Sequence, residues 1–246
     1  MPKYRELIVY GCSLTKDNYI DTWADQLSSI LDCRLVNCAE RGAGYTYIMQ
    51  KVLSNPIPNQ DTLSVIMWPS ADRFDLYVNS ATPHLQNDVD QASWLDGNAP
   101  AFVDYNGNYI QDHGWYINGA VPRGYKNIYY KYFYNQTTHV NLAWSTIVAV
   151  QQYFKSVSAD YIMCNSYPLQ NLIQYHNDGV TDFNHQLYDK IDLSKFVDAA
   201  DSKGFIRLVK EQGFEFFNPH YPISSAHQWY VDNYILPKLK NANSLP

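Results

Sequence analysis

Three features that mark common classes of protein are scarce in this sequence. Its 246 residues include only four cysteines, and three of them lie in or at the ends of apolar strand-like runs, so we expect reduced thiols. The cysteines lack C-x-x-C spacing, so we expect no metal site. The net charge is -6 and the longest basic cluster is Lys238 to Lys240, which argues against nucleic acid as a partner. Apolar runs stay well short of the roughly 20 residues of a membrane span. We expect a cytoplasmic or virion-associated protein with no signal peptide, transmembrane segment or membrane partner.

Aromatic residues are abundant instead, and many of them fall in one segment. The chain has 22 Tyr and 6 Trp, and aromatic residues make up 15% of it. The segment from about 77 to 136 interrupts the regular pattern of the chain and ends in the Tyr-rich stretch Asn127–Tyr134. A structureless loop of this length is unusual in a compact domain, so we expect an ordered insertion lying over the strand ends. Both a carbohydrate contact and a homo-oligomer or virion contact fit this composition.

Outside this segment, short apolar runs alternate with amphipathic stretches. The apolar runs predict strands over Glu6–Cys12, Cys33–Ala39, Thr62–Trp68 and Ala159–Cys164. The amphipathic stretches predict helices over Tyr19–Leu31, Tyr45–Leu53, Val140–Phe154 and Ser224–Leu239, and a mainly helical stretch over Lys195–Gln212 that is broken near Gly204. Continuously apolar strands that alternate with helices indicate a parallel sheet covered on both faces. The predicted fold class is α/β, a three-layer α/β/α sandwich with a mainly parallel, flavodoxin-like sheet, in one domain over residues 1–246.

The loops after the first three predicted strands form the candidate site, because open α/β sheets bind ligands beyond the carboxyl ends of their strands. Ser13 lies in the first loop, within Gly11-Cys-Ser-Leu-Thr15. A serine at such a turn can meet backbone N–H groups that stabilise an oxyanion, so Ser13 is a candidate nucleophile. A serine that merely begins a turn is the alternative. The glycine spacing of a phosphate-binding loop is missing, which argues against a nucleotide binder.

The three loops resemble the sequence blocks of the SGNH/GDSL hydrolases. Gly11-Cys-Ser-Leu-Thr15 is similar to the first block, with Cys12 in place of the usual Asp. Asn37-Cys-Ala-Glu-Arg-Gly42-Ala-Gly44 resembles the second block, and Gly42 matches the glycine whose N–H contributes to the family's oxyanion hole. Val65-Ile-Met-Trp68-Pro-Ser-Ala-Asp-Arg73-Phe resembles the third block as it occurs in an SGNH-like group of bacteriophage and bacterial genomes. The pieces are short, and their order along the chain carries the resemblance.

The last family block contains the general base and precedes the final helix. Asn218-Pro-His220-Tyr-Pro-Ile-Ser-Ser-Ala-His227 resembles this block, with one extra residue. The resemblance therefore implies His220 as the base, with His227 as the alternative if the extra residue shifts the loop. Neither Phe217 nor Asn218 supplies the carboxylate that normally orients such a histidine. A backbone carbonyl is one substitute, and an acid from elsewhere is another, with Asp72 and Asp75 as distant candidates.

Three further departures from the family pattern affect the expected chemistry. The third block lacks the Asn that donates to the oxyanion, and Ser70 is the candidate substitute. Arg73 is expected either to form a buried ion pair or to bind an anionic substrate group. Cys12 is a rival nucleophile, but adjacent side chains on an extended segment face opposite sides, and the resemblance favours Ser13.

The resemblance implies a serine esterase or deacylase that needs no cofactor. The expected substrate is a small-molecule or carbohydrate ester, and removal of O-acyl groups from carbohydrate is the leading hypothesis. The alternative is a catalytically impaired phage structural protein that binds a glycan or a partner through the Tyr-rich insertion. The missing carboxylate favours this alternative, whereas the ordered set of family blocks favours the enzyme.

Overall fold

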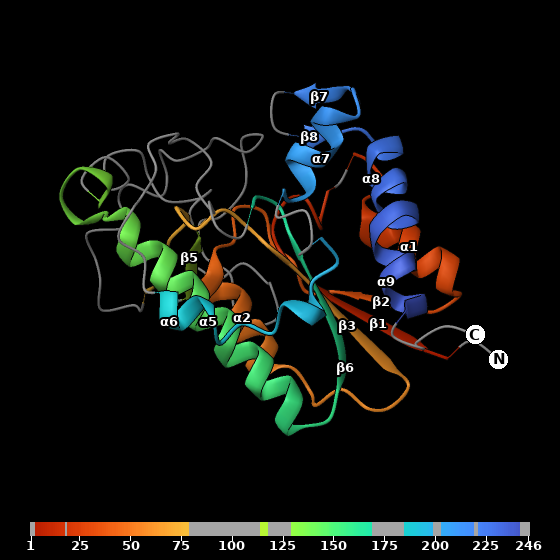
Figure 1. Ribbon diagram of the computed structural model, residues 1–246, viewed down its shortest axis with the longest axis horizontal. Coiled ribbons are helices and arrows are strands. Elements are labelled where there is room, and N and C mark those ends of the chain that lie inside the picture. Colours follow the sequence, from red (N-terminus) through yellow and green to blue (C-terminus); the bar gives the residue numbers. More distant parts are fainter. Residues whose placement is uncertain are drawn as a thin grey trace.

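The centre of the fold is a four-stranded parallel sheet in the order β2-β1-β3-β6. The computed structural model describes residues 3–17, 19–78, 114–117, 129–168, 185–198, 203–218 and 221–241. The strands are β1 (Glu6–Tyr10), β2 (Arg34–Asn37), β3 (Thr62–Trp68) and β6 (Asp160–Asn165). One face of the sheet carries α1 (Trp23–Leu31) and α8 (Ser224–Tyr230), and the other carries α2 (Tyr45–Ser54) and α5 (Gln136–Ser156) (Figure 1). The predicted three-layer α/β/α sandwich is confirmed.

The burial of each strand follows from its place in the sheet. All seven residues of β3 are buried, because β3 pairs with β1 and β6 and helices cover both of its faces. β2 lies at an edge, and none of its four residues is fully buried. Since the four strands are parallel, their carboxyl ends meet at one edge of the sheet, where the candidate loops begin.

Local signals set the ends of α1. The backbone N–H of Thr22 donates to the carboxylate of Asp25 at 2.8 Å, which fixes the first turn. The helix predicted from Tyr19 therefore starts later, at Trp23. It ends where Asp32 takes the left-handed conformation with φ 49°.

The stretch predicted over Lys195–Gln212 shows the expected break near Gly204, but residues 196–198 before the break are not helical. The described residues there form the short helix η2 (Leu193–Lys195) and then α7 (Phe205–Glu211). Gly204 has φ 71°, and a Cβ at this position would lie 2.5 Å from the backbone of Tyr167. A continuous helix is therefore excluded, and α7 begins directly after the glycine.

Beyond the main sheet, the described residues form two small antiparallel pairs. β4 (Asp75–Val78) pairs with β5 (Gly114–Ile117), and β7 (Phe216–Asn218) pairs with β8 (Tyr221–Pro222). The remaining elements are η1 (Tyr129–Phe133), α6 (His185–Tyr188), η3 (Val231–Ile235) and α9 (Leu236–Asn241). Most of the predicted insertion, including residues 79–113, lies outside the described residues. Among the described helices, none has the length and apolar character needed to cross a membrane.

Candidate active site

Ser13 lies in a tight turn directly after β1. The carbonyl of Cys12 accepts hydrogen bonds from the N–H groups of Thr15 at 2.9 Å and Lys16 at 3.2 Å. A Cβ on Gly11 would lie 2.2 Å from Oγ1 of Thr15 and 3.1 Å from the carbonyl of Met67, so the turn needs glycine here. Ser13 is 4% exposed. These contacts of the turn hold Ser13 at the carboxyl end of β1.

The loop after β2 is fastened to this turn. The N–H of Glu40 donates to the carbonyl of Gly11 at 3.2 Å, and the carboxylate of Glu40 pairs with Lys16 at 2.9 Å. The side chain of Asn37 donates to the carbonyl of Thr15 at 3.0 Å. These bonds hold the first and second predicted blocks against each other.

Two backbone N–H groups of these loops, those of Ser13 and Gly42, are the candidate oxyanion donors. Within the described ranges, the N–H groups of Ser13 and Gly42 have no acceptor. Gly42 has φ 79°, a conformation that favours glycine. Backbone donors of this kind can stabilise the oxyanion that develops when a nucleophile attacks an ester.

The segment after β3 brings Arg73 to the same region. Its Nη1 donates to the carbonyl of Ala43 at 3.3 Å. Burial by itself lowers the pKa of Arg73, but Cys12, Asp72 and Tyr221 lie close enough to raise it, so the guanidinium stays charged. Arg73 is therefore hydrogen-bonded to the second loop, and the serine turn and β8 lie near enough to affect its pKa. Ser70 belongs to the same segment and its side chain is fully buried.

Asp75 anchors the first turn of α2. Its carboxylate accepts the N–H of Gly44 at 2.9 Å and of Tyr47 at 2.8 Å. A Cβ on Gly44 would lie 2.8 Å from this carboxylate, so only glycine allows the approach. Burial raises the pKa of Asp75 to about 6, although the backbone donors and Arg73 oppose the shift. The sequence indicated Asp75 only as a distant substitute for the missing acid, and its contacts are with α2.

Asp75→Asn is expected to remove a pH dependence from the stability. The native pKa of about 6 exceeds the ordinary 3.8, so between these values the native state binds more protons than the unfolded chain. The wild-type free energy of unfolding should therefore gain at most about 3 kcal/mol from this group as pH falls from about 6 to 4. Urea unfolding across this range, with exposed Asp61→Asn as the control, measures the effect. A wild-type-to-Asp75→Asn difference that stays constant with pH would contradict it.

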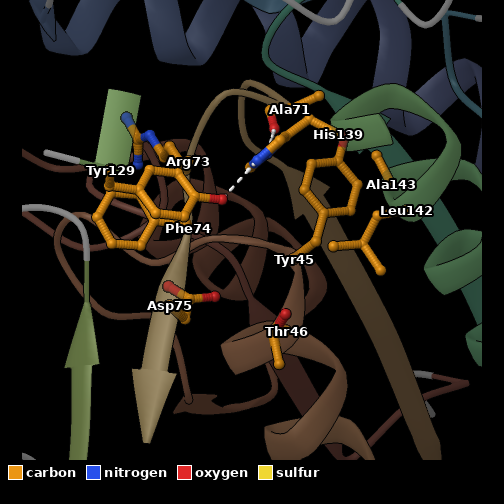
Figure 2. A pocket seen from close by; sticks show the side chains of 10 residues that line it. All are labelled: Tyr45, Thr46, Ala71, Arg73, Phe74, Asp75, Tyr129, His139, Leu142 and Ala143. Atoms are coloured by element: carbon orange, nitrogen blue, oxygen red, sulfur yellow. Dashed lines mark hydrogen bonds between the residues drawn. The ribbon is translucent and has the colours of Figure 1, made fainter. Parts of the chain in front are cut away.

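A small cavity lies beside this segment. Its volume is about 110 Å³, and its walls come from α2, the segment after β3, η1 and α5. The lining residues are Tyr45, Thr46, Ala71, Arg73, Phe74, Asp75, Tyr129, His139, Leu142 and Ala143 (Figure 2). Both ionisable and aromatic side chains therefore meet in it.

His139 is held in one orientation in the cavity wall. Its Nδ1 lies 3.0 Å from the carbonyl of Ala71 and therefore donates, while Nε2 lies 2.6 Å from the hydroxyl of Tyr129 and accepts (Figure 2). Burial lowers the pKa of His139, so the ring is neutral. The ring of Tyr129 stacks on Phe74 with centroids 3.8 Å apart. Sequence reasoning missed His139, because a histidine on the inner face of an amphipathic helix looks like a core residue.

Of the two candidate bases, the structure describes His227 but not His220. His220 lies outside the described residues. Its neighbour Tyr221, in β8, lies close enough to Arg73 to influence the pKa of Arg73. His227 is 1% exposed, and its Nδ1 accepts the N–H of Trp23 at 3.2 Å. Burial lowers the pKa of His227 to about 3, which makes it a weak base and favours a structural role at the start of α1.

The described residues offer no cluster of three or more His, Cys, Asp or Glu side chains that could hold a metal ion. Two of the four cysteines, Cys12 and Cys164, are buried, and all four are free thiols. Cys12 is fully buried beneath the serine turn.

Several solved structures resemble the chain at modest similarity, and two of those described below are carbohydrate esterases. TesA aligns at 15% identity over 96% of this chain and 98% of TesA, with a TM-score of 0.49. Axe2, an acetylxylan esterase from Geobacillus stearothermophilus, aligns at 10% identity over 96% of this chain and 94% of its own, with a TM-score of 0.47. A carbohydrate esterase family 2 enzyme from Corynascus thermopiles aligns at 11% identity over 97% of this chain and 67% of its own, with a TM-score of 0.44. No protein-family model and no curated protein sequence matches the chain.

Proposed function

We propose that the protein is a serine esterase or deacylase that removes O-acyl groups from carbohydrate. The observation that carries this proposal is the pairing of a strand-end serine, Ser13, with two candidate oxyanion donors, the backbone N–H groups of Ser13 and Gly42. A nucleophile and an oxyanion hole are the two parts that acyl transfer needs in fixed positions.

The reaction follows from these parts. Oγ of Ser13 bonds to the ester carbonyl carbon while its proton passes to His220, and the N–H groups of Ser13 and Gly42 bind the resulting oxyanion. Collapse of this intermediate breaks the bond to the alcohol, which leaves with the proton from His220. Water then attacks the acyl-serine in the same way and releases the acid. Arg73 remains a candidate for contact with the substrate, because its guanidinium lies beside these loops.

A labelling experiment tests the proposal on the wild-type protein. A fluorophosphonate should lose fluoride and form one phosphorus bond to Oγ of Ser13, which peptide mass mapping would locate. Hydrolysis of p-nitrophenyl acetate and of an acetylated xylo-oligosaccharide is measured in parallel. Labelling at Ser13 together with hydrolysis supports the proposal; no label and no hydrolysis of several acyl esters would contradict it.

A second candidate function is binding of a glycan or protein partner without catalysis. Two aromatic side chains of η1, Tyr132 and Phe133, are 66% and 72% exposed, and such side chains suit either partner. The absence of a carboxylate at Phe217 and Asn218 favours the same candidate. A protein that binds an acetylated oligosaccharide without hydrolysing it would support this function over the esterase.

A further inference from the structure

We infer that the cavity between α2, the segment after β3, η1 and α5 binds an uncharged, hydroxyl-bearing group, the alcohol portion of the ester substrate. This inference rests on the proposed function for the identity of the substrate. The inference goes beyond the proposed function because it gives a ligand-binding role to side chains of η1 and α5, which are not part of the serine turn.

The charge of the cavity favours an uncharged ligand. Its lining contains one cation, Arg73, and one carboxylate, Asp75, on the same segment, and burial keeps His139 neutral. A charged ligand would therefore leave one charge in this confined space without compensation, at a cost in desolvation. A neutral ligand avoids this cost.

The hydrogen-bonding groups favour hydroxyls. In the described part of the chain, Arg73 makes one hydrogen bond, to Ala43, which leaves donors for a ligand. The carboxylate of Asp75 accepts the backbone N–H groups of Gly44, Tyr47 and Thr46, and because a carboxylate has about four acceptor positions it keeps capacity for one more donor. The Thr46 hydroxyl points into the cavity and has no partner among the described residues (Figure 2). A hydroxyl group both donates and accepts, so it can satisfy all three side chains.

The shape of the cavity favours one small part of a larger molecule. A volume of about 110 Å³ matches roughly three to four water molecules. The stacked rings of Phe74 and Tyr129 form one wall, and Leu142 and Ala143 form another. Apolar walls around a few polar groups are typical of sites that bind the edge of a sugar ring.

Arg73 connects this cavity with the proposed oxyanion hole. It lines the cavity and also donates to the carbonyl of Ala43, the residue that follows Gly42. The cavity therefore adjoins the loop that contains Gly42, one of the two proposed oxyanion donors. The Tyr129–His139 hydrogen bond keeps the wall rigid, because it fixes η1 against α5.

Binding of methyl β-xylopyranoside, an uncharged sugar without an ester, tests the inference by titration followed with NMR. Thr46→Val removes one hydrogen-bonding hydroxyl and should raise the Kd about three- to tenfold. Leu142 lines the cavity and is half-exposed, so the larger side chain of Leu142→Trp should occupy part of the cavity and raise the Kd about tenfold or more. Thr137→Val makes the same chemical change as Thr46→Val on α5 outside the cavity lining and should leave the Kd unchanged. Thermal unfolding checks that each variant is folded.

The outcomes separate this inference from the proposed function. Absence of saturable binding, equal Kd values in all variants, or preferential binding of acetate in the cavity would overturn the inference. Binding of the glycoside needs no nucleophile, so it can persist even if no ester is hydrolysed; that result would refute the esterase and keep the site. In an active enzyme, Leu142→Trp should raise KM while kcat stays near the wild-type value.

Discussion

Ser13→Ala is expected to lower kcat/KM for ester hydrolysis by about three orders of magnitude or more. Loss of the attacking oxygen removes the covalent route, and only binding and oxyanion stabilisation remain. The free energy of unfolding should change by less than about 1 kcal/mol, because the Ser13 side chain makes no hydrogen bond with the described residues. Steady-state kinetics and urea unfolding of the same preparation give both quantities.

Cys12→Ala is the matched control for this experiment. Cys12 is adjacent to Ser13 and fully buried, so its removal should cost some stability and leave most of the activity. If Cys12→Ala lost the activity and Ser13→Ala kept it, the thiol would be the nucleophile. Equal rates in wild type and both variants would show that neither residue carries the reaction.

The main sheet could be predicted from the sequence because its pattern is local. A central parallel strand must be apolar on both faces, and Thr62–Trp68 has that composition and is buried throughout. The serine turn could be located for the same reason, because it directly follows such a strand. Chain order and the right-handed crossover then bring the first three loops to one edge.

The small β4–β5 sheet and the backbone conformation before α7 depend on contacts between segments that are distant in the sequence. β4 and β5 pair Asp75 with Ile117, and no periodicity in either strand indicates a partner forty residues away. The break before α7 could be predicted near Gly204, but the close approach of Gly204 to the backbone of Tyr167 could not. The short stretches involved are four to seven residues long, so tertiary contacts outweigh their local preference.

The cavity could not be predicted from the sequence either, because its lining residues come from segments that are far apart in the chain. Asp75, Tyr129 and His139 lie in three separate segments and carry no motif that the sequence analysis connects. The Tyr-rich stretch was identified as a binding or interface element, but the sequence contains nothing that places Tyr129 against His139. Their hydrogen bond becomes visible only when η1 docks on α5.

His227→Ala is expected to lower the free energy of unfolding by about 3 kcal/mol at pH 7. The substitution empties a fully buried volume next to Phe205 and leaves the N–H of Trp23 without its acceptor. His227→Asn keeps an acceptor in a similar position and should lose less, about 1 to 2 kcal/mol. Urea unfolding followed by tryptophan fluorescence distinguishes the two variants.

The same residue should make the wild type sensitive to acid. Burial lowers its pKa from 6.5 to about 3, so between these values the unfolded chain binds more protons than the native state. The free energy of unfolding should therefore lose up to about 5 kcal/mol from this group as pH falls from about 7 to 3. The direction is opposite to that expected for Asp75, and the difference between wild type and His227→Asn isolates it. A difference that does not shrink on acidification would contradict the buried neutral state.

Kinetics of His227→Asn decide between the two candidate bases. The Nδ1 atom of His227 already accepts the N–H of Trp23, and burial lowers the pKa of His227 to about 3, so the variant should retain most of the wild-type kcat/KM near neutral pH. His220→Ala should instead lose activity on the scale of Ser13→Ala, because a nucleophile and its base act as a unit. If His227→Asn remained folded but lost activity while His220→Ala kept it, the proton would pass through His227, and the loop after β1 would have to open toward α8 during turnover.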